Sequence, residues 1–177
     1  DKKEQKKRFK KLMESRSSAW RVSEDDLRRN KDFDLYKEMN DEMLEYTDTA
    51  YAPWTIVETM DREFATVKIY TAVIEALKAA LRRKAEGSAS DTTVSHVPLP
   101  ASEYNDEVLR TSSLKKVDLS LTLERDEYKK QLRELQSRIE ELHGELYRRR
   151  IPMILGFEGW DAGGKGGAIK RLTERMD

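Results

Sequence analysis

Closely spaced glycines surround a lysine toward the end of the chain, in the order Gly159, Gly163, Gly164, Lys165, Gly166 and Gly167. A glycine, four residues, a second glycine and a lysine are typical of the Walker A loop, whose backbone amides surround phosphate oxygens. Glycine permits the tight curl that turns these amides inward, and Lys165 supplies a mobile ammonium group to the transferred phosphate. The sequence therefore predicts a site for a polyphosphorylated ligand, with phosphoryl transfer as its chemistry.

One position departs from the common form of this loop. Gly166 stands where a Ser or Thr hydroxyl usually binds magnesium, so the metal needs another oxygen. Asp161 is the candidate ligand for Mg²⁺, because a carboxylate beside bound phosphates repels them unless a divalent cation lies between. We therefore assign catalytic roles to Asp161 and Lys165. The alternative for Asp161 is an outward-facing side chain that bonds to its own backbone.

Two further cations follow the loop. Lys170 and Arg171 lie on the first turn of the helix that Gly166 and Gly167 should open. They are candidates to extend the phosphate-binding set along a polyanionic chain. The alternative is that both are ordinary solvated helix residues.

The element before the loop is an apolar run over residues 151–157, short enough for a buried parallel strand. Pro152 stands near its start, where a missing amide is tolerated. A strand, a phosphate loop and a helix in this order predict an α/β domain. Such a domain needs further parallel strands to complete the hydrogen bonds of this one, and we expect them outside the 177 residues.

A long helix should precede that strand, with Ser120 as its cap. Its apolar residues repeat at alternating steps of four and three, as in a coiled-coil seam: Tyr128, Leu132, Leu135, Ile139, Leu142 and Leu146. This seam has two interpretations. It either joins two copies of the chain in a homo-oligomer or packs within its own domain, and we favour the second.

The first half of the chain is predicted to be mainly helical. A lysine-rich helix should cover residues 1 to about 18, and Ser23 and Asp26 form a capping-box pattern for a helix to about Thr47. An apolar stripe on that helix predicts core contacts: Tyr36, Met39, Met43 and Tyr46. Residues 55–59 are β-branched and predict a short strand, and Asp61 should cap a helix to about Lys84.

Between the two halves, residues 86 to about 116 have few periodic apolar positions and several turn residues, which predicts a linker. His96 lies in this segment without a neighbouring His, so we assign it no metal role.

Composition limits the classes of partner. Of the 177 residues 38% are charged, and 34 Lys and Arg balance 34 Asp and Glu, so no overall field attracts nucleic acid or an acidic membrane. The lack of Cys excludes disulfides and thiolate chemistry and fits a reducing compartment. No apolar run approaches the roughly 18 residues of a membrane span. We expect a cytoplasmic protein with no nucleic-acid or membrane partner.

Residues 157–172 resemble the Walker A segment of the family-2 polyphosphate kinases, whose loop reads Phe-Glu-Gly-x-Asp-Ala-Ala-Gly-Lys-Gly-Gly. Gly163 in place of Ala is the notable difference. Residues 117–120 and the helix after them are similar to the opening of that family's domain. Toward the start of the chain, Glu4-Gln-x-x-Arg8-Phe9, the segment from Trp20 to Asp26 and residues 36–54 resemble its closing third.

The reversed order, tail before head, is explained if two such domains lie in tandem and the chain crosses their junction. This layout resembles the two-domain polyphosphate:AMP phosphotransferases of the family. It implies that residues 1–85 end an upstream domain, 86–118 form a linker, and 119–177 begin a second P-loop domain that is truncated. The chain alone is therefore expected to be inactive.

The resemblance also implies a fold and a reaction. The fold is a P-loop kinase-like parallel sheet with helices on both faces and a helical lid. The reaction moves a phosphoryl group from inorganic polyphosphate to a nucleoside monophosphate, AMP to ADP, with Mg²⁺. The family's Walker B acid and lid arginines are missing from this sequence, so the choice of AMP depends on the tandem layout.

Two other functions remain open at this point. One is a P-loop nucleotide kinase that uses ATP as the donor. The other is a non-catalytic helical assembly module in which the loop only binds anions. The choice of phosphoryl donor separates the first from polyphosphate chemistry, and phosphoryl transfer itself separates both enzymes from the second.

Overall fold

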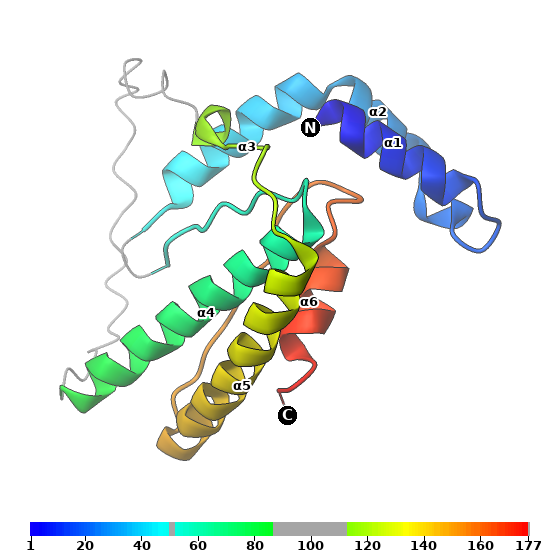
Figure 1. The fold of residues 1–177 in the computed structure, drawn as a ribbon. Helices are drawn as coiled ribbons and strands as arrows, with labels where there is room; N and C mark the ends of the chain where they lie inside the picture. The colour runs from blue at the N-terminus through cyan, green and yellow to red at the C-terminus, as the bar shows by residue number, and fades with distance from the viewer. Residues whose placement is uncertain (50–51, 87–112, 177) are drawn as a thin grey trace, which may run out of the picture.

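The computed structural model describes residues 1–49, 52–86 and 113–176. Helices make up the regular structure of these residues (Figure 1): α1 (Lys2–Met13), α2 (Glu24–Lys31), α3 (Phe33–Thr47), α4 (Arg62–Ala85), α5 (Arg125–Arg149) and α6 (Lys165–Thr173). Two short 3₁₀ turns, η1 (Ala19–Arg21) and η3 (Ser113–Lys116), accompany them. The predominance of helix agrees with the sequence, whereas the sheet of the predicted α/β fold does not appear in the described residues.

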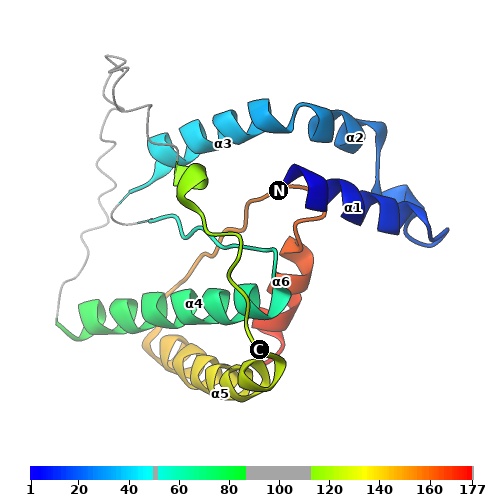
Figure 2. The ribbon, with the colours of Figure 1, turned by 45° about the horizontal axis from the view of Figure 1, so that its top comes forward.

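Helices α1, α2 and α3 form one layer, and α4, α5 and α6 form another (Figures 1 and 2). The predicted capping box at the start of α2 is confirmed. The Ser23 hydroxyl accepts from the backbone amide of Asp26 at 3.2 Å, and the Asp26 carboxylate accepts from the amide of Ser23 at 2.8 Å. The single helix predicted to run to Thr47 is instead interrupted at Asp32, which separates α2 from α3.

The stripe on α3 is not the core face that its spacing predicted. Met39 and Tyr46 are 54% and 48% exposed, and the buried residue of this helix is Phe33 at its start. Among the described helices, α3 makes its main contacts with the neighbouring α2 and η3. A 3.6-residue period shows which side of a helix is apolar, but it does not say whether another element covers that side.

The main core lies between α4 and α5, which run side by side (Figures 1 and 2). As predicted, Asp61 caps α4, accepting from the amide of Phe64 at 2.6 Å. The buried cluster draws on three helices: Tyr70, Val73, Ile74 and Leu77 of α4, Ile139, Leu142 and Leu146 of α5, and Leu172 of α6. The a/d seam of α5 therefore packs within the chain, but mainly on α4, which the predicted division assigns to the upstream domain and not to the domain of α5.

The predicted cap of α5 is wrong. Ser120 bonds to Asp118, with its amide at 2.9 Å and its hydroxyl at 2.6 Å from that carboxylate. The helix begins only at Arg125, after Glu124, whose side chain makes no capping bond. A serine that forms a local turn with a preceding aspartate cannot at the same time cap a helix that starts five residues later.

Both predicted strands are also absent from the described residues. Residues 55–59 and 151–157 are extended but have no ladder. The second run is not buried, since Ile154 is 98% exposed and Leu155 is 44% exposed. A strand exists only if a neighbour completes its hydrogen bonds, and no described segment forms a ladder with these residues.

Most of the predicted linker, with His96, falls in 87–112 and lies outside the described residues. None of the described helices is both long enough and apolar enough to cross a membrane.

Candidate phosphate-binding site

The predicted phosphate loop connects an extended segment to α6, as its motif requires (Figure 1). Gly164 is the N-cap of α6 and adopts a left-handed conformation with φ of 94°. Ala162, two residues earlier, is also left-handed, with φ of 59°. Residues that alternate in this way turn successive N–H groups toward one concave side and form an anion-binding nest. The positive end of the α6 dipole points at the same place.

Gly163 closes the curl of the loop. Its amide donates to the carbonyl of Trp160 at 3.0 Å. A Cβ atom at position 163 would lie only 2.7 Å from that carbonyl oxygen, so the backbone approaches too closely for any side chain. Of the predicted phosphate-binding glycines, this is the one that the loop requires for lack of space.

Lys165 is the first residue of α6 and points back over the loop. Its ammonium group donates to the carbonyl of Gly159 and, at 3.1 Å, to the carbonyl of Trp160. The side chain is half-buried. An ammonium held by two loop carbonyls lies next to the nest and can exchange them for phosphate oxygens, since a lysine is a mobile point charge.

Asp161 lies in the loop, and its carboxylate forms an ion pair with Arg29 of α2 at 3.1 Å. The same guanidinium nitrogen lies 3.7 Å from Asp26. Asp161 raises the pKa of Arg29, chiefly by accepting its hydrogen bond. The carboxylate therefore faces a cation from a distant helix, a contact that the sequence did not reveal.

A magnesium ion fits this donor set. No three acidic or histidine side chains gather closely enough among the described residues to hold a metal by themselves. Mg²⁺, however, is usually held by one or two carboxylates together with substrate phosphates. The Asp161 carboxylate is 45% exposed at the loop and can take that part.

The two cations after the loop lie in the last turn of α6 and not, as the sequence predicted, in its first turn, and they differ in their surroundings. Lys170 is exposed, whereas Arg171 is half-buried and donates from Nε to the Thr66 hydroxyl of α4 at 3.1 Å. The carbonyl of Arg171 accepts from the Tyr70 hydroxyl at 2.5 Å, and burial raises the pKa of that phenol. Arg171 thus fixes α6 on α4, a contact that the sequence did not reveal.

Four residues of the first layer contact the loop and were missed as site residues. Gln5 and Arg8 of α1 donate to loop carbonyls, Arg29 pairs with Asp161, and Phe33 stacks on Trp160 with ring centroids 5.2 Å apart. The only signal was that Gln5 and Arg8 belong to a segment that resembles a family motif. Nothing in the spacing of these residues shows that they meet a loop more than 150 positions later.

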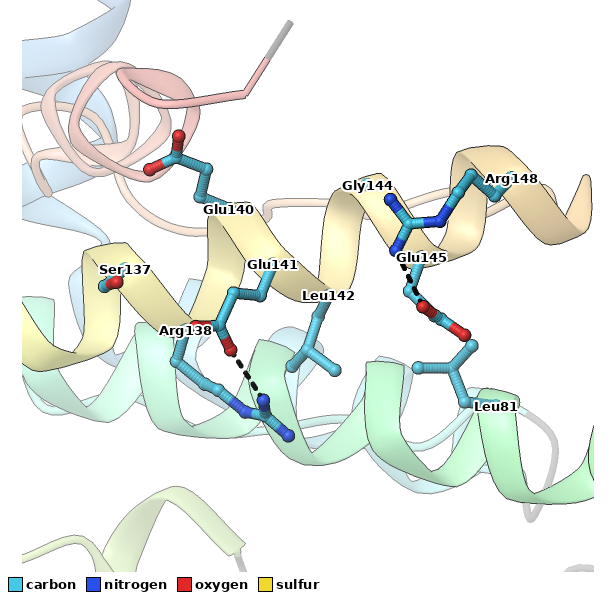
Figure 3. Close-up of a pocket in the computed structure, with 9 residues that line it drawn as sticks. All are labelled: Leu81, Ser137, Arg138, Glu140, Glu141, Leu142, Gly144, Glu145 and Arg148. Atoms are coloured by element: carbon cyan, nitrogen blue, oxygen red, sulfur yellow. Dashed lines mark hydrogen bonds and ion pairs between the residues drawn. The ribbon is translucent and has the colours of Figure 1, made fainter.

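A separate hollow lies over α5 and the end of α4, away from the loop (Figure 3). Four of its polar residues form two pairs, Arg138 with Glu141 and Arg148 with Glu145, both at 2.8 Å. These are short-range pairs along an exposed helix face, typical of a solvated surface. The hollow offers no group that the phosphate chemistry needs.

Comparison with known proteins places this loop in a family. The model of the family described as Polyphosphate kinase 2 matches residues 1–85 and 122–177, and so includes both the loop and the helices that contact it. The chain belongs to this family. The resemblance seen in the sequence is confirmed, and the polyphosphate kinase 2 match extends to α1 and α2 as well as to the Walker A segment.

Relatives within the family point in the same direction. The chain is 33% identical over 179 residues to a polyphosphate:AMP phosphotransferase of Pseudomonas syringae pv. tomato and 32% identical over 176 residues to one of Pseudomonas aeruginosa. Each alignment covers 99% of this chain but 34% of the relative, so the chain spans about a third of their length. An ADP-polyphosphate phosphotransferase 3 of Rhizobium meliloti is 45% identical over 49 residues, which is 28% of this chain and 17% of that protein. No solved structure matches.

Proposed function

We propose that the protein transfers a phosphoryl group from inorganic polyphosphate to AMP and forms ADP. The observation that carries this proposal is a Walker A loop with the left-handed residues of a nest, at the start of α6, in a chain of the polyphosphate kinase 2 family. The names of the two Pseudomonas relatives support the donor and the acceptor.

The loop acts by positioning and by charge. Its inward amides and the N-terminus of α6 bind phosphate oxygens, and Lys165 neutralises the charge that develops on the transferred group. Gly159, Gly163 and Gly164 shape the loop, and Gly166 and Gly167 let the phosphate approach the helix backbone. The exposed Lys170 extends the positive track toward the rest of the polyphosphate. Arg171 adds charge to it from its place against α4.

Asp161 holds Mg²⁺ together with phosphate oxygens of the substrate. When bound, the ion neutralises phosphate charge and orients the phosphates for transfer. Without the metal, Arg29 forms an ion pair with the Asp161 carboxylate. An exposed ion pair of this kind is weak, so the Asp161 carboxylate would remain available to a divalent ion next to phosphates.

The complete domain has a parallel sheet of which residues 151–157 form one strand. The exposure of Ile154 and Leu155 supports this proposal, because a run of exposed apolar side chains marks a surface that another element packs against. We also propose the tandem division into 1–85, a linker at 86–118 and 119–177. The family match leaves out residues 86–121, which accords with a linker.

The test uses the full-length protein. ADP formation is measured with AMP and Mg²⁺ and either polyphosphate or ATP as the donor, and ADP is offered as a second acceptor. We expect polyphosphate with AMP to give the highest kcat/KM. A preference for ATP would identify a nucleotide kinase instead, and no transfer from either donor would leave an anion-binding module.

A further inference from the structure

A loop that turns its amides toward phosphate must turn its carbonyls outward. Carbonyls on the outer side of the loop that are buried from water need hydrogen-bond donors, because a buried carbonyl without one lowers the stability of the fold. In this loop the carbonyls of Asp161 and Ala162 are two such acceptors, and both are partly buried. Both receive donors from α1: Gln5 Nε2 lies 3.2 Å from the Asp161 oxygen, and Arg8 Nη1 lies 3.1 Å from the Ala162 oxygen.

The contact at Ala162 falls on the most strained residue of the loop. A residue with a Cβ atom seldom adopts a left-handed conformation, and Ala162 does so with φ of 59°. Such a conformation persists only where the surroundings fix it. The guanidinium of Arg8 supplies a charged donor to the carbonyl of this residue, and so favours the orientation that the nest needs.

The two donors are themselves held in place. Gln5 is 7% exposed, and its Oε1 accepts from Asn30 of α2 at 2.9 Å. Arg8 binds Glu4 at 3.0 Å and the carbonyl of Thr59 at 2.8 Å through its other nitrogens. Because each side chain has further partners, neither has to be ordered when the loop forms.

The spacing of the donors matches that of the acceptors. Gln5 and Arg8 are three residues apart on α1 and therefore lie on one face of the helix, while Asp161 and Ala162 are consecutive. The loop residue before them, Trp160, stacks on Phe33 of α3 with an angle of 17° between the rings. Helices α1 to α3 thus contact three consecutive loop residues.

We propose that Gln5 and Arg8 are positioning residues of the phosphate loop, which act through the carbonyls of Asp161 and Ala162 and do not touch phosphate. Under the proposed tandem division, the end of one domain would then shape the phosphate loop of the next. The inference rests on the proposed function only in that the loop binds phosphate.

The experiment uses Arg8→Met, Arg8→Lys and Gln5→Met in the full-length protein, with Lys10→Met as a control. Lys10 is exposed on the same helix, and the control removes the same charge as Arg8→Met. Hydrogen exchange of peptides covering 157–168 is followed without ligand, and binding of magnesium tripolyphosphate is measured by calorimetry. Peptides from α4 and α5 report on general loosening.

For Arg8→Met we expect loop exchange about tenfold faster and tripolyphosphate binding about tenfold weaker, with α4 and α5 exchange unchanged. Gln5→Met should act in the same direction. Arg8→Lys keeps one donor and should recover part of both properties. Lys10→Met should match the wild type in exchange and stay within about twofold of it in binding.

Three results would overturn the proposal. The first is wild-type loop exchange in Arg8→Met, and the second is an equal loss of binding in Lys10→Met, which would make net charge the cause. The third is recovery of binding by Arg8→Lys without recovery of loop protection. If the wild type does not bind tripolyphosphate while Arg8→Met still loosens the loop, the proposed function fails and the positioning role stands.

Discussion

At the scale of the residue, the loop leaves least room at Gly163. The family pattern that the sequence resembles has Ala at this position, yet a Cβ atom here would lie 2.7 Å from the carbonyl oxygen of Trp160. In this chain the loop is therefore closed more tightly than an alanine allows. The turn that Gly163 makes with Trp160 therefore requires a glycine at this position.

Gly163→Ala should open that turn and displace the amides of the nest. We expect kcat/KM for polyphosphate to fall about tenfold, which corresponds to about 1.4 kcal/mol. Gly144→Ala is the control, because its added Cβ would make only an ordinary contact with Arg148 at 3.5 Å. Full activity of Gly163→Ala would mean that the loop yields to a methyl group at little cost.

Lys165→Ala should act mainly on turnover, because in the proposed reaction the ammonium meets charge that develops in the transition state. We expect kcat to fall by about a hundredfold, or about 2.7 kcal/mol, as when one charge-stabilising donor is removed. Lys129→Ala, on the exposed side of α5, is the control. A kcat within about threefold of wild type, or about 0.6 kcal/mol, would place the activity elsewhere in the protein.

Asp161 and Arg29 predict opposite effects on magnesium. Asp161→Asn removes the charge that holds the ion, so half-maximal rate should require more Mg²⁺. Arg29→Met removes the cation that competes for this carboxylate at 3.1 Å, so half-maximal rate should require less. Titration of Mg²⁺ against initial rate measures both. A shift in the same direction for the two variants would contradict the assignment of Asp161 as the ligand.

At the scale of the element, the start of α2 depends on two reciprocal bonds. Hydrogen bonds from the amide and hydroxyl of Ser23 lower the pKa of Asp26 below its usual value. A carboxyl group with a lowered pKa stabilises the folded state above the unfolded pKa, near 4, and this contribution is lost as the pH falls through the folded value.

Ser23→Ala should therefore lower the free energy of unfolding by about 1 kcal/mol at pH 7, the usual cost of a lost cap. The difference from wild type should be smaller at pH 3, because the pH has then fallen below the unfolded pKa and part of the contribution of Asp26 is lost. Urea unfolding at the two pH values measures it, with the exposed Ser137→Ala as the control. An equal difference at pH 7 and pH 3 would mean that the Asp26 charge does not contribute.

Helices could be predicted from the sequence because their signals are local. The cap at Asp61 and the apolar face of α5 depend on residues three and four positions apart, and they were found. The strands at 55–59 and 151–157 could not be decided in this way, since a strand depends on neighbours elsewhere in the chain. The apolar stripe on α3 was wrongly predicted to be buried for the same reason. The spacing of its residues does not show whether another element packs on them.

The same distinction between local and distant contacts applies to the residues of the candidate site. The loop and Lys165 were recognised from their spacing, because the motif is continuous in the chain. The contacts of Gln5, Arg8 and Arg29 with the loop join residues 132 to 156 positions apart. A local sequence pattern does not show such a contact. The resemblance to the family included the α1 segment but gave its residues no role.

At the scale of the whole molecule, the two halves of the chain share one core. Helix α4 comes before residues 87–112 and α5 after them, yet Ile139 of α5 is fully buried in the cluster with Tyr70 and Ile74 of α4. The first layer contacts the loop that opens α6. The segment that precedes the proposed linker therefore contributes both to the stability of the second half and to the shape of its site.

Two isoleucines test both this core and the proposed sheet. Ile139 is 0% exposed, whereas Ile154 is 98% exposed in the segment proposed as a strand. In the 177-residue chain, Ile139→Ala should destabilise by about 2 to 5 kcal/mol, the usual cost of emptying a core site, and Ile154→Ala by less than about 0.5 kcal/mol. Hydrogen exchange of the α4 and α5 amides measures both.

In the full-length protein the two substitutions should become alike. If further strands pair with residues 151–157 and helices cover them, Ile154 becomes a core residue, and its truncation should also cost about 2 to 5 kcal/mol. Ile139→Ala serves as the internal reference, because its surroundings are already complete in α4 and α5. If Ile154→Ala remained neutral in the full-length protein, this segment would not lie in a buried sheet, and the proposed P-loop kinase architecture would be wrong at its first strand.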